Sequence, residues 1–352
     1  MQIELRVVRK FSVLLLLFGL TASQPAQAQT YTVTDLGTFG GARTAAFSIN
    51  KSGQVAGFAE TGDGRSQAFV YTDGTLFNLG TLGGIDSYAY RISDSGFVIG
   101  RSKNAAGKYR AFVVILNSSM FDISSLDARL GGAFSFATAV NGVGQVVGYF
   151  HTSNEHRAAR NRVFLYSDHR ITDLGTFGGE DSIVMAINDA GQMAGSYGKD
   201  PQADYAERVA FLYSGGSVIN LGSFGGKVTI ANDLNNAGQV VGQSQNARGE
   251  YHAFSYSGGA LVDLGVLPGG TQSFAYGVNN SGQVVGASDS ASSTLHAFLH
   301  SGGLMKDLNT LIPANSGWVL TEARAINSSG QIAGNGIKDG EQRAFLLKPI
   351  VN

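Results

Sequence analysis

One eight-residue pattern recurs seven times along the chain and limits the possible folds more than any other feature. Its clearest copy runs from Asn279 to Gly286 and contains Asn, two small or polar residues, Gly, Gln, two apolar residues and Gly. Successive copies lie 43, 48, 47, 47, 44 and 48 residues apart. A period of this length is typical of stacked supersecondary units, so we expect a repeat architecture. The first glycines of the copies are Gly53, Gly96, Gly144, Gly191, Gly238, Gly282 and Gly330.

The start of each copy has the residues of a tight turn. Asn can hydrogen-bond to its own backbone two residues further on, and a glycine three residues later accepts a left-handed conformation without steric penalty. In the clearest copy the flanking residues, 275–278 and 283–285, are short and mostly apolar. The pattern therefore predicts a hairpin between two short strands, with the seven glycines in a structural role at the turn.

Two further elements complete each unit. A third apolar segment contains Ala-Phe, as in Ala253-Phe254, and a fourth ends in Asp/Asn-Leu-Gly, as in Asp263-Leu264-Gly265. Turn dipeptides such as Gly258-Gly259 separate the two and suit a hairpin. Helical periodicity is absent. Four strands in about 46 residues is the size of a propeller blade, so the chain is predicted to be all-β.

The last repeat is incomplete, and the repeat array begins with the type of strand that the last repeat lacks. Residues 31–37 form a fourth-type strand without its predecessors, and residues 344–347 form a third-type strand without a successor. In a ring the first strand can complete the last sheet and remove two exposed edges. We therefore predict a seven-bladed β-propeller closed by its N-terminal strand. An open solenoid is the alternative, although it would need atypical capping repeats.

The repeats resemble the HAF repeat family of bacterial extracellular proteins. The His-Ala-Phe triplet of that family is present as His252-Ala253-Phe254 and His296-Ala297-Phe298, and its Asp-Leu-Gly element with a following Gly-Gly pair is present at 173–179. Other copies replace the His, for example by Gln67. The resemblance covers nearly the whole chain after residue 28. It implies an extracellular, propeller-like protein without an assigned general activity, so no catalytic residues are carried over.

The first 28 residues have the composition of a secretory signal. Arg6, Arg9 and Lys10 precede an apolar run at 11–20, and Ala26-Gln27-Ala28 fits a cleavage site. The run is too short for a membrane span, although an uncleaved anchor remains the alternative. We expect a mature single domain at 29–352, secreted to the periplasm or the extracellular space, without a membrane span and monomeric. The C-terminus carries no apolar tail, so a released protein is expected.

Charge argues against nucleic acid as a partner. Removing three basic residues and Glu4 with the signal, from totals of 25 basic and 26 acidic residues, leaves a net charge of −3. A nucleic-acid-binding domain would carry a basic excess. The sequence has no cysteine and therefore neither a disulfide framework nor a thiol nucleophile.

Comparison among the repeats separates structural residues from candidate ligand residues. The Asp of Asp-Leu-Gly and the His of His-Ala-Phe recur at fixed positions, so a structural role is favoured for both. Insertions differ between repeats and gather in loops predicted on one face, where rigid scaffolds usually carry binding sites. Unselected, solvated insertions are the alternative. The candidate ligand-binding residues are His151, His156, Arg157, Arg160, Arg162, Tyr205, Arg208 and Trp318.

Known catalytic and cofactor patterns are missing from the sequence. There is no His-Glu-x-x-His, no Gly-x-Ser-x-Gly and no phosphate-binding Gly-Lys-Ser/Thr loop. Neither a metal nor a cofactor is expected. The leading hypothesis is a non-enzymatic binding or scaffold protein whose ligand is an unknown protein or glycan. The alternatives are a propeller enzyme acting on polysaccharide, with residues of several blades meeting at the central channel, and a carbohydrate-binding lectin.

Overall fold

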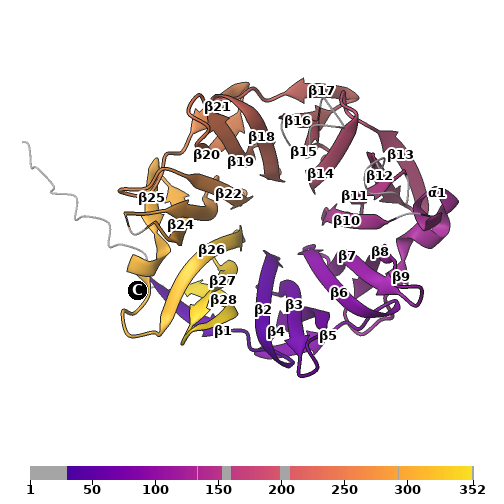
Figure 1. Cartoon of the computed structure of the whole chain (residues 1–352), viewed down its shortest axis with the longest axis horizontal. Helices are drawn as coiled ribbons and strands as arrows, with labels where there is room; N and C mark the ends of the chain where they lie inside the picture. The colour runs from indigo at the N-terminus through magenta and orange to yellow at the C-terminus, as the bar shows by residue number, and fades with distance from the viewer. Residues whose placement is uncertain (1–29, 133, 153–159, 199–206, 292, 351–352) are drawn as a thin grey trace, which may run out of the picture.

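The strands form a ring of sheets around a central axis. The computed structural model describes residues 30–132, 134–152, 160–198, 207–291 and 293–350. Seven strands, β2, β6, β10, β14, β18, β22 and β26, lie nearest the axis, one from each repeat, and the other strands follow outward (Figure 1). The fold is a β-propeller, and the all-β prediction is confirmed. The predicted signal at 1–28 lies outside the described residues.

The strands of each sheet follow the order of the sequence repeats. Repeat 1 comprises β2 (Gly40–Ile49), β3 (Val55–Thr61), β4 (Ser66–Thr72) and β5 (Thr75–Asn78); repeat 2 comprises β6 (Gly83–Ile92), β7 (Phe97–Asn104), β8 (Tyr109–Ile115) and β9 (Phe121–Asp122). Repeat 3 comprises β10 (Ser135–Val140), β11 (Val146–His151), β12 (Asn161–Ser167) and β13 (Arg170–Gly175). Repeat 4 comprises β14 (Asp181–Ile187), β15 (Met193–Gly198), β16 (Arg208–Ser214) and β17 (Ser217–Asn220).

The remaining repeats follow the same order. Repeat 5 comprises β18 (Gly225–Leu234), β19 (Val240–Asn246), β20 (Tyr251–Ser257) and β21 (Ala260–Asp263); repeat 6 comprises β22 (Ser273–Val278), β23 (Val284–Asp289), β24 (Leu295–Ser301) and β25 (Leu304–Asp307). Repeat 7 comprises β26 (Trp318–Ile326), β27 (Ile332–Lys338) and β28 (Glu341–Pro349), joined by β1 (Tyr31–Asp35). A short helix, α1 (Ala128–Gly132), and two 3₁₀ turns at Ile123–Leu126 and Leu308–Leu311 are the helical elements of the described chain.

The hydrogen-bonded sheets do not match the predicted seven units one to one. Among the described residues there are five four-stranded sheets and one eight-stranded sheet, which unites repeats 4 and 5. A single parallel pair, Arg208 with Val228, joins β16 to β18. The two repeats approach closely enough at this position to exchange backbone hydrogen bonds, which the separate-sheet prediction did not include.

The repeated turn has the predicted conformation. The seven turn glycines all have positive φ, from 73° to 86°, the conformation that the turn pattern predicts. In the clearest copy, the Asn279 Oδ1 accepts hydrogen bonds from the backbone N–H groups of Ser281 and Gln283, at 3.1 and 3.0 Å. The Asn279 Nδ2 donates to the Gln283 Oε1 at 2.8 Å. The Asn side chain therefore stabilises its own turn, and the Gln side chain fixes the orientation of the Asn amide.

The same asparagines also connect one repeat to the next. The Asn279 Nδ2 donates to the carbonyl oxygen of Asn327 at 3.0 Å, and the Asn327 Nδ2 donates to that of Asn50, also at 3.0 Å. In repeat 2 the position is Ser93, whose carbonyl still accepts from Asn50. We call these residues the asparagine ring: Asn50, Asn141, Asn188, Asn235, Asn279 and Asn327. Because Asn327 and Asn50 are 277 residues apart, their bond ties the last repeat to the first.

Replacing Asn279 with Ala is expected to lower the free energy of unfolding by about 1–3 kcal/mol, because two turn N–H groups and a buried carbonyl lose their partners. Urea denaturation followed by far-ultraviolet circular dichroism measures the change. Ser281→Ala is the matched control, since Ser281 is exposed in the same turn. Equal stability of the two variants would show that the asparagine ring contributes nothing.

The N-terminal strand joins the sheet of the last repeat, as predicted. β1 pairs antiparallel with β28 from Tyr31 opposite Pro349 to Asp35 opposite Phe345. Tyr31 is fully buried in the core cluster of repeat 7, and burial raises the pKa of its hydroxyl to about 12. The Asp35 carboxylate lies 3.2 Å from the Lys338 Nζ.

The two recurring polar residues of the motifs pair with each other. The His252 Nδ1 lies 2.7 Å from the Asp263 Oδ2, and the equivalent His296 and Asp307 are also 2.7 Å apart. Asp263 also accepts a hydrogen bond at 2.8 Å from the backbone N–H of Gly265, in the Leu-Gly turn that follows it. These contacts agree with the structural role predicted for both residues, since each pair links the third strand to the fourth.

Candidate functional site

The residue three positions before the repeat Asn faces a cavity on the central axis. This cavity has a volume of ≈ 260 Å³, and all seven repeats contribute this residue to its lining. The preceding position is a buried Ala in six repeats and Val184 in the other. At the lining position, by contrast, residue type varies in size, charge and aromaticity. We call the set the inner ring: Phe47, Tyr90, Thr138, Met185, Asn232, Tyr276 and Arg324.

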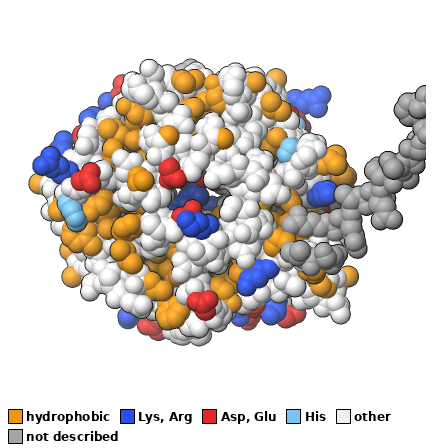
Figure 2. Space-filling view, turned by 180° about the vertical axis from the view of Figure 1, so that it is seen from behind, with side chains coloured by type: hydrophobic (Ala, Val, Ile, Leu, Met, Phe, Trp, Pro, Cys, Tyr) orange, Lys and Arg blue, Asp and Glu red, His pale blue; other side chains and the backbone are white. Residues whose placement is uncertain are grey.

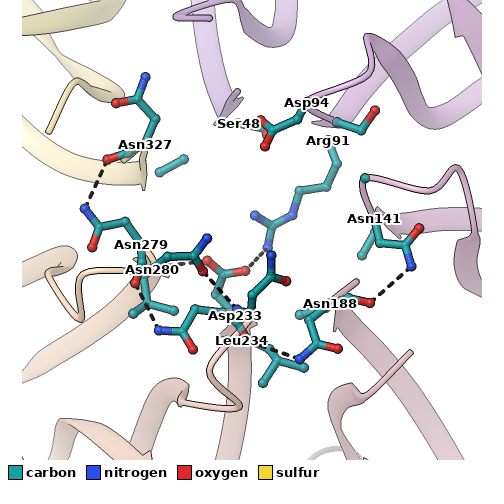
Figure 3. Close-up of a pocket in the computed structure, with 18 of the residues that line it drawn as sticks. Ser48, Arg91, Asp94, Asn141, Asn188, Asp233, Leu234, Asn279, Asn280 and Asn327 are labelled. Carbon is teal, nitrogen blue, oxygen red and sulfur yellow. Dashed lines mark hydrogen bonds and ion pairs between the residues drawn. The ribbon is translucent and has the colours of Figure 1, made fainter. Parts of the chain in front are cut away.

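A second cavity, of ≈ 200 Å³, lies on the axis beside the asparagine ring. It is lined by both polar and apolar side chains, and Figure 3 shows Arg91 of β6 extending across it toward Asp233 of β18. The Arg91 Nη2 lies 3.0 Å from the Asp233 Oδ1, and the Asp233 Oδ2 accepts the backbone N–H of Val278 at 3.0 Å. The side chains are only 21% and 15% exposed, respectively. This ion pair therefore bridges opposite walls of the channel.

The centre of one propeller face is hollowed, with acidic and basic side chains at the opening (Figure 2). Arg91 lines both axial cavities, and Asp233 lines the one beside the asparagine ring. Their ion pair thus lies where the two cavities meet. A ligand in the inner-ring cavity would therefore lie against this ion pair.

A tyrosine, an arginine and a glutamate meet beside the inner-ring cavity. The Arg324 guanidinium carbon lies 4.3 Å from the centre of the Tyr276 ring, and the Arg324 Nη1 lies 3.7 Å from the Glu322 Oε2. Burial raises the pKa of Tyr276 to about 12, with the charge of Glu322 adding to the rise and Arg324 opposing it. The phenol therefore keeps its proton at neutral pH and lies within the electrostatic influence of a carboxylate.

Aromatic rings extend from the inner ring across the first three repeats. Ring centres are 6.0 Å apart for Phe47 and Phe58, and 5.0 Å apart for Phe58 and Tyr88. The series continues through Tyr109 and Phe136 at 6.4 Å each, and ends with Phe136 stacked on Tyr149 at 4.9 Å. We call this set the aromatic arc: Phe47, Phe58, Tyr88, Tyr109, Phe136 and Tyr149. Phe47 and Tyr149, the two ends of this arc, line the inner-ring cavity.

The described candidate residues from the sequence do not share one pocket. His151 lies 5.6 Å from the Phe136 ring and extends the aromatic arc. Arg160 pairs with Glu180, Arg162 with Asp173 at 3.0 Å, and Arg208 with Asp181 at 2.5 Å. Trp318 packs edge-on against Phe345 in the core, with ring centres 5.8 Å apart. His156, Arg157 and Tyr205 lie outside the described residues.

The inner ring is absent from the residues predicted above, although its signal is present in the sequence. Unlike residues stand at one position of each repeat, directly after a near-constant Ala and three positions before the repeat Asn or Ser93. The inner-ring residues can be identified by comparing the seven repeats position by position, and not only in their inserted loops. What the sequence does not reveal is that this position faces the axis, because strand twist and ring closure decide that.

Membrane-spanning helices and metal-binding groups of three or more side chains are both missing from the described residues. No helix there is long and apolar enough to cross a membrane. The same residues contain no group of three or more His, Asp or Glu side chains arranged to hold a metal ion.

Comparison with known proteins identifies the fold. No family model and no curated protein matches the chain. Among solved structures, the β-propeller domain of the Trilobed protease from Pyrococcus furiosus is similar, with 13% identity, 74% of this chain and 82% of that chain covered, and a TM-score of 0.53. A puromycin-hydrolyzing peptidase of Mycobacterium tuberculosis (12% identity, 89% and 53% covered, TM-score 0.56) and an acylaminoacyl peptidase of Pyrococcus horikoshii (10%, 90% and 54%, TM-score 0.55) also match.

These neighbours correct the functional expectation from the sequence. The prediction of a non-enzymatic binding or scaffold protein is contradicted, because the similar structures are named as peptidases or as part of a protease. The prediction relied on the absence of known catalytic motifs, and in a propeller catalytic groups can come from separate repeats without forming a motif. At this level of identity the likeness establishes the propeller fold. This chain spans about half the length of the two peptidases.

Proposed function

We propose that this chain is a propeller enzyme that cleaves a polysaccharide, with its substrate bound in the inner-ring cavity and along the aromatic arc. The supporting observation is the inner ring, where the position directly after a near-constant buried Ala carries side chains of unlike size, charge and aromaticity and lines one cavity. A purely structural position would keep one residue type, as the preceding buried Ala does. Aromatic faces suit a sugar polymer because they pack against the apolar faces of sugar rings.

The candidate catalytic residues are Tyr276 and Glu322, with Arg324 as the group that positions them. Cleavage of a glycosidic bond needs a proton donor for the departing oxygen and a second group that acts on the sugar. Burial raises the pKa of Tyr276 to about 12, so the phenol is protonated at neutral pH. Glu322 supplies a carboxylate, and Arg324 contacts both residues. The arrangement supports either hydrolysis, with Glu322 activating water, or elimination, with Glu322 removing a ring proton.

The names of the structural neighbours favour a second candidate, cleavage of peptides. The sequence lacks a Gly-x-Ser-x-Gly pattern and has no cysteine, so a peptidase activity would need a different nucleophile. The inner-ring groups could still bind an extended peptide, since aromatic rings and guanidinium groups contact peptide chains equally well.

Assays with purified protein separate these reactions. We expect new reducing ends from a panel of polysaccharides, and ultraviolet absorbance of an unsaturated sugar if the reaction is an elimination. Glu322→Gln and Tyr276→Phe should each lower kcat by about 100-fold or more, because each removes one half of the proton transfer. Tyr256→Phe is the matched control, since Tyr256 is buried in the outer core of repeat 5.

Two results contradict the proposal. One is cleavage of a polysaccharide that is unchanged in both channel variants, which would move the reaction elsewhere. The other is cleavage of labelled peptides but of no polysaccharide, which would favour the second candidate.

We also propose that the eight-stranded sheet represents two blades, so that the propeller has seven. The proposal is supported by the single residue pair that joins the two halves of the sheet and by the equal number of strands in each half.

We further propose that the chain belongs to the HAF repeat family. We also propose that residues 1–28 direct secretion and that the mature domain at 29–352 is monomeric. Mass spectrometry of the exported protein, with Gln29 as its first residue, would support the cleavage site; an intact N-terminus would contradict it.

A further inference from the structure

Arg101 of β7 is enclosed by four aromatic rings beside the channel. Its guanidinium carbon lies 4.5 Å from the Tyr109 ring centre and 4.8 Å from that of Tyr88. The Phe136 and Tyr90 ring centres follow at 5.5 and 5.7 Å. Tyr90 belongs to the inner ring, and the other three belong to the aromatic arc. The cation therefore lies where the arc meets the candidate active site.

One donor of Arg101 is buried and has no acceptor among the described residues. The Arg101 Nε is buried without a hydrogen-bond partner, and the described chain provides no ion pair for the guanidinium. A guanidinium carries five N–H donors, and aromatic faces attract its charge without accepting those hydrogens in the manner of an oxygen. Leaving the buried Nε–H unsatisfied costs free energy, and an oxygen of a ligand would satisfy it.

A neighbouring cation shows the usual arrangement. Lys103, two residues further along β7, also lies over the Tyr109 ring, at 5.2 Å. Its Nζ is 2.6 Å from the Asp86 Oδ2, so its charge is already neutralised. The structure thus places two cations against one ring and pairs only one of them with a carboxylate.

Comparison among the repeats marks Arg101 as specific to repeat 2. The position directly after the second motif glycine carries Arg101 there, and no other repeat has a charged residue at this position. Two of the equivalents, Phe58 and Tyr149, are members of the aromatic arc. The full set of equivalents in the other repeats is Phe58, Tyr149, Ser196, Gln243, Ala287 and Asn335.

We propose that Arg101 is an anion subsite that binds an acidic group, a carboxylate or a sulfate ester, on the sugar polymer. This inference rests on the proposed function and narrows its substrate class to acidic polysaccharides. A planar guanidinium can donate two parallel hydrogen bonds to either group, and the surrounding rings hold it in place while packing against the sugar. Because Arg101 contacts Tyr90 and not Tyr276, the subsite binds a sugar beside the cleaved bond and takes no part in proton transfer.

The test is equilibrium binding of three oligosaccharides of equal length to the whole purified protein by calorimetry. The probes are a galacturonate oligosaccharide, a sulfated galactan oligosaccharide and an uncharged galactan oligosaccharide. We expect at least one acidic probe to bind about 10-fold or more tightly than the uncharged one, with an affinity that falls as salt rises. The probe that shows the preference identifies carboxylate or sulfate as the group recognised.

Variants separate ligand recognition from packing. Arg101→Met keeps an unbranched apolar side chain among the rings, and it should remove the preference for the acidic probe while leaving the affinity for the uncharged probe unchanged. Arg101→Lys should recover only part of the preference, since it restores the charge without the paired donors. Lys103→Met, the matched loss of a cation on the same strand, should keep the preference. Thermal denaturation of each variant checks that the fold is intact.

Three results would overturn the inference: wild-type protein binding none of the probes, equal binding of acidic and uncharged probes, or an undiminished preference in Arg101→Met. The outcome is separable from that of the proposed function. Selective binding without cleavage would retain the subsite and contradict the enzyme. Cleavage of uncharged polysaccharides that is unaffected by Arg101→Met would retain the enzyme and contradict the subsite.

Discussion

Replacing Gly286 with Ala is expected to unfold the protein or to lower its free energy of unfolding by more than about 3 kcal/mol, at or above the upper end for overpacked cores. A Cβ at this position would lie 1.9 Å from the carbonyl oxygen of Phe274 and 2.8 Å from atoms of the Phe298 ring. The oxygen belongs to the innermost strand of the repeat, and Phe298 is fully buried. Neither can move aside without separating two strands from each other.

The contact explains why each motif ends in glycine and why each third strand carries Phe. Gly286 is directly opposite Phe298 in the register of β23 and β24, and the other six repeats place the same two residue types opposite each other. All seven phenylalanines are fully buried: Phe69, Phe112, Phe164, Phe211, Phe254, Phe298 and Phe345. In five repeats, those of Gly57, Gly148, Gly242, Gly286 and Gly334, the ring is among the nearest atoms to the missing Cβ, so the two positions form one packing unit.

Chemical denaturation of Gly286→Ala beside Gly302→Ala measures the effect. Gly302 has a φ of 59°, and a Cβ added there would have no atom within 4 Å, so Ala meets only a left-handed backbone penalty of roughly 1–2 kcal/mol. Similar stabilities for the two variants would mean that the strands adjust to the added methyl group, and the packing argument would be wrong.

Removing the closing strand is expected to have the second largest effect. A chain that begins at Gly37 loses the five residue pairs between β1 and β28 and the fully buried Tyr31. It also loses Leu36, whose backbone N–H donates to the carbonyl of Ala344 at 3.1 Å. Burial of the tyrosine and leucine side chains together with these hydrogen bonds suggests a loss of about 5 kcal/mol. The freed edge of β28 should also promote association between molecules.

The comparison protein for this experiment is a chain that begins at Thr30, which keeps β1 whole. Thermal denaturation and size-exclusion chromatography report stability and association, and hydrogen exchange should show lost protection confined first to β28. Adding a peptide of residues 30–37 should restore part of the protection. Equal melting temperatures of the two chains would contradict the closure of the ring by β1.

Much of the fold could be predicted because its signals are local. The Asn279 turn depends on bonds between residues two and four positions apart, and the left-handed Gly282 follows from the same turn. Closure also could be predicted, since a fourth-type strand at the beginning and a third-type strand at the end leave one arrangement without free edges. The link between β16 and β18 could not, because it depends on how closely two neighbouring sheets approach.

The candidate site was mostly missed because its residues lie far apart in the sequence. Arg91 and Asp233 belong to repeats 2 and 5, 142 residues apart, and no spacing rule connects them. Trp318 was a candidate because it is the only Trp, yet it packs in the core. The expectation of a non-enzymatic protein has the same origin, since sequence motifs consist of residues that are neighbours in the chain and a propeller gathers single residues from many repeats.

The amino-acid sequence thus suffices for the repeat unit, its turns, the all-β class and the meeting of the chain ends, since these depend on short-range hydrogen bonding and on the pairing of unmatched strands. Only the folded ring decides which side of each inner strand faces the axis and which side chains meet there. Tyr276, Arg324 and Arg101 acquire their surroundings from strands of different repeats, and those surroundings depend on twist and packing across the whole ring.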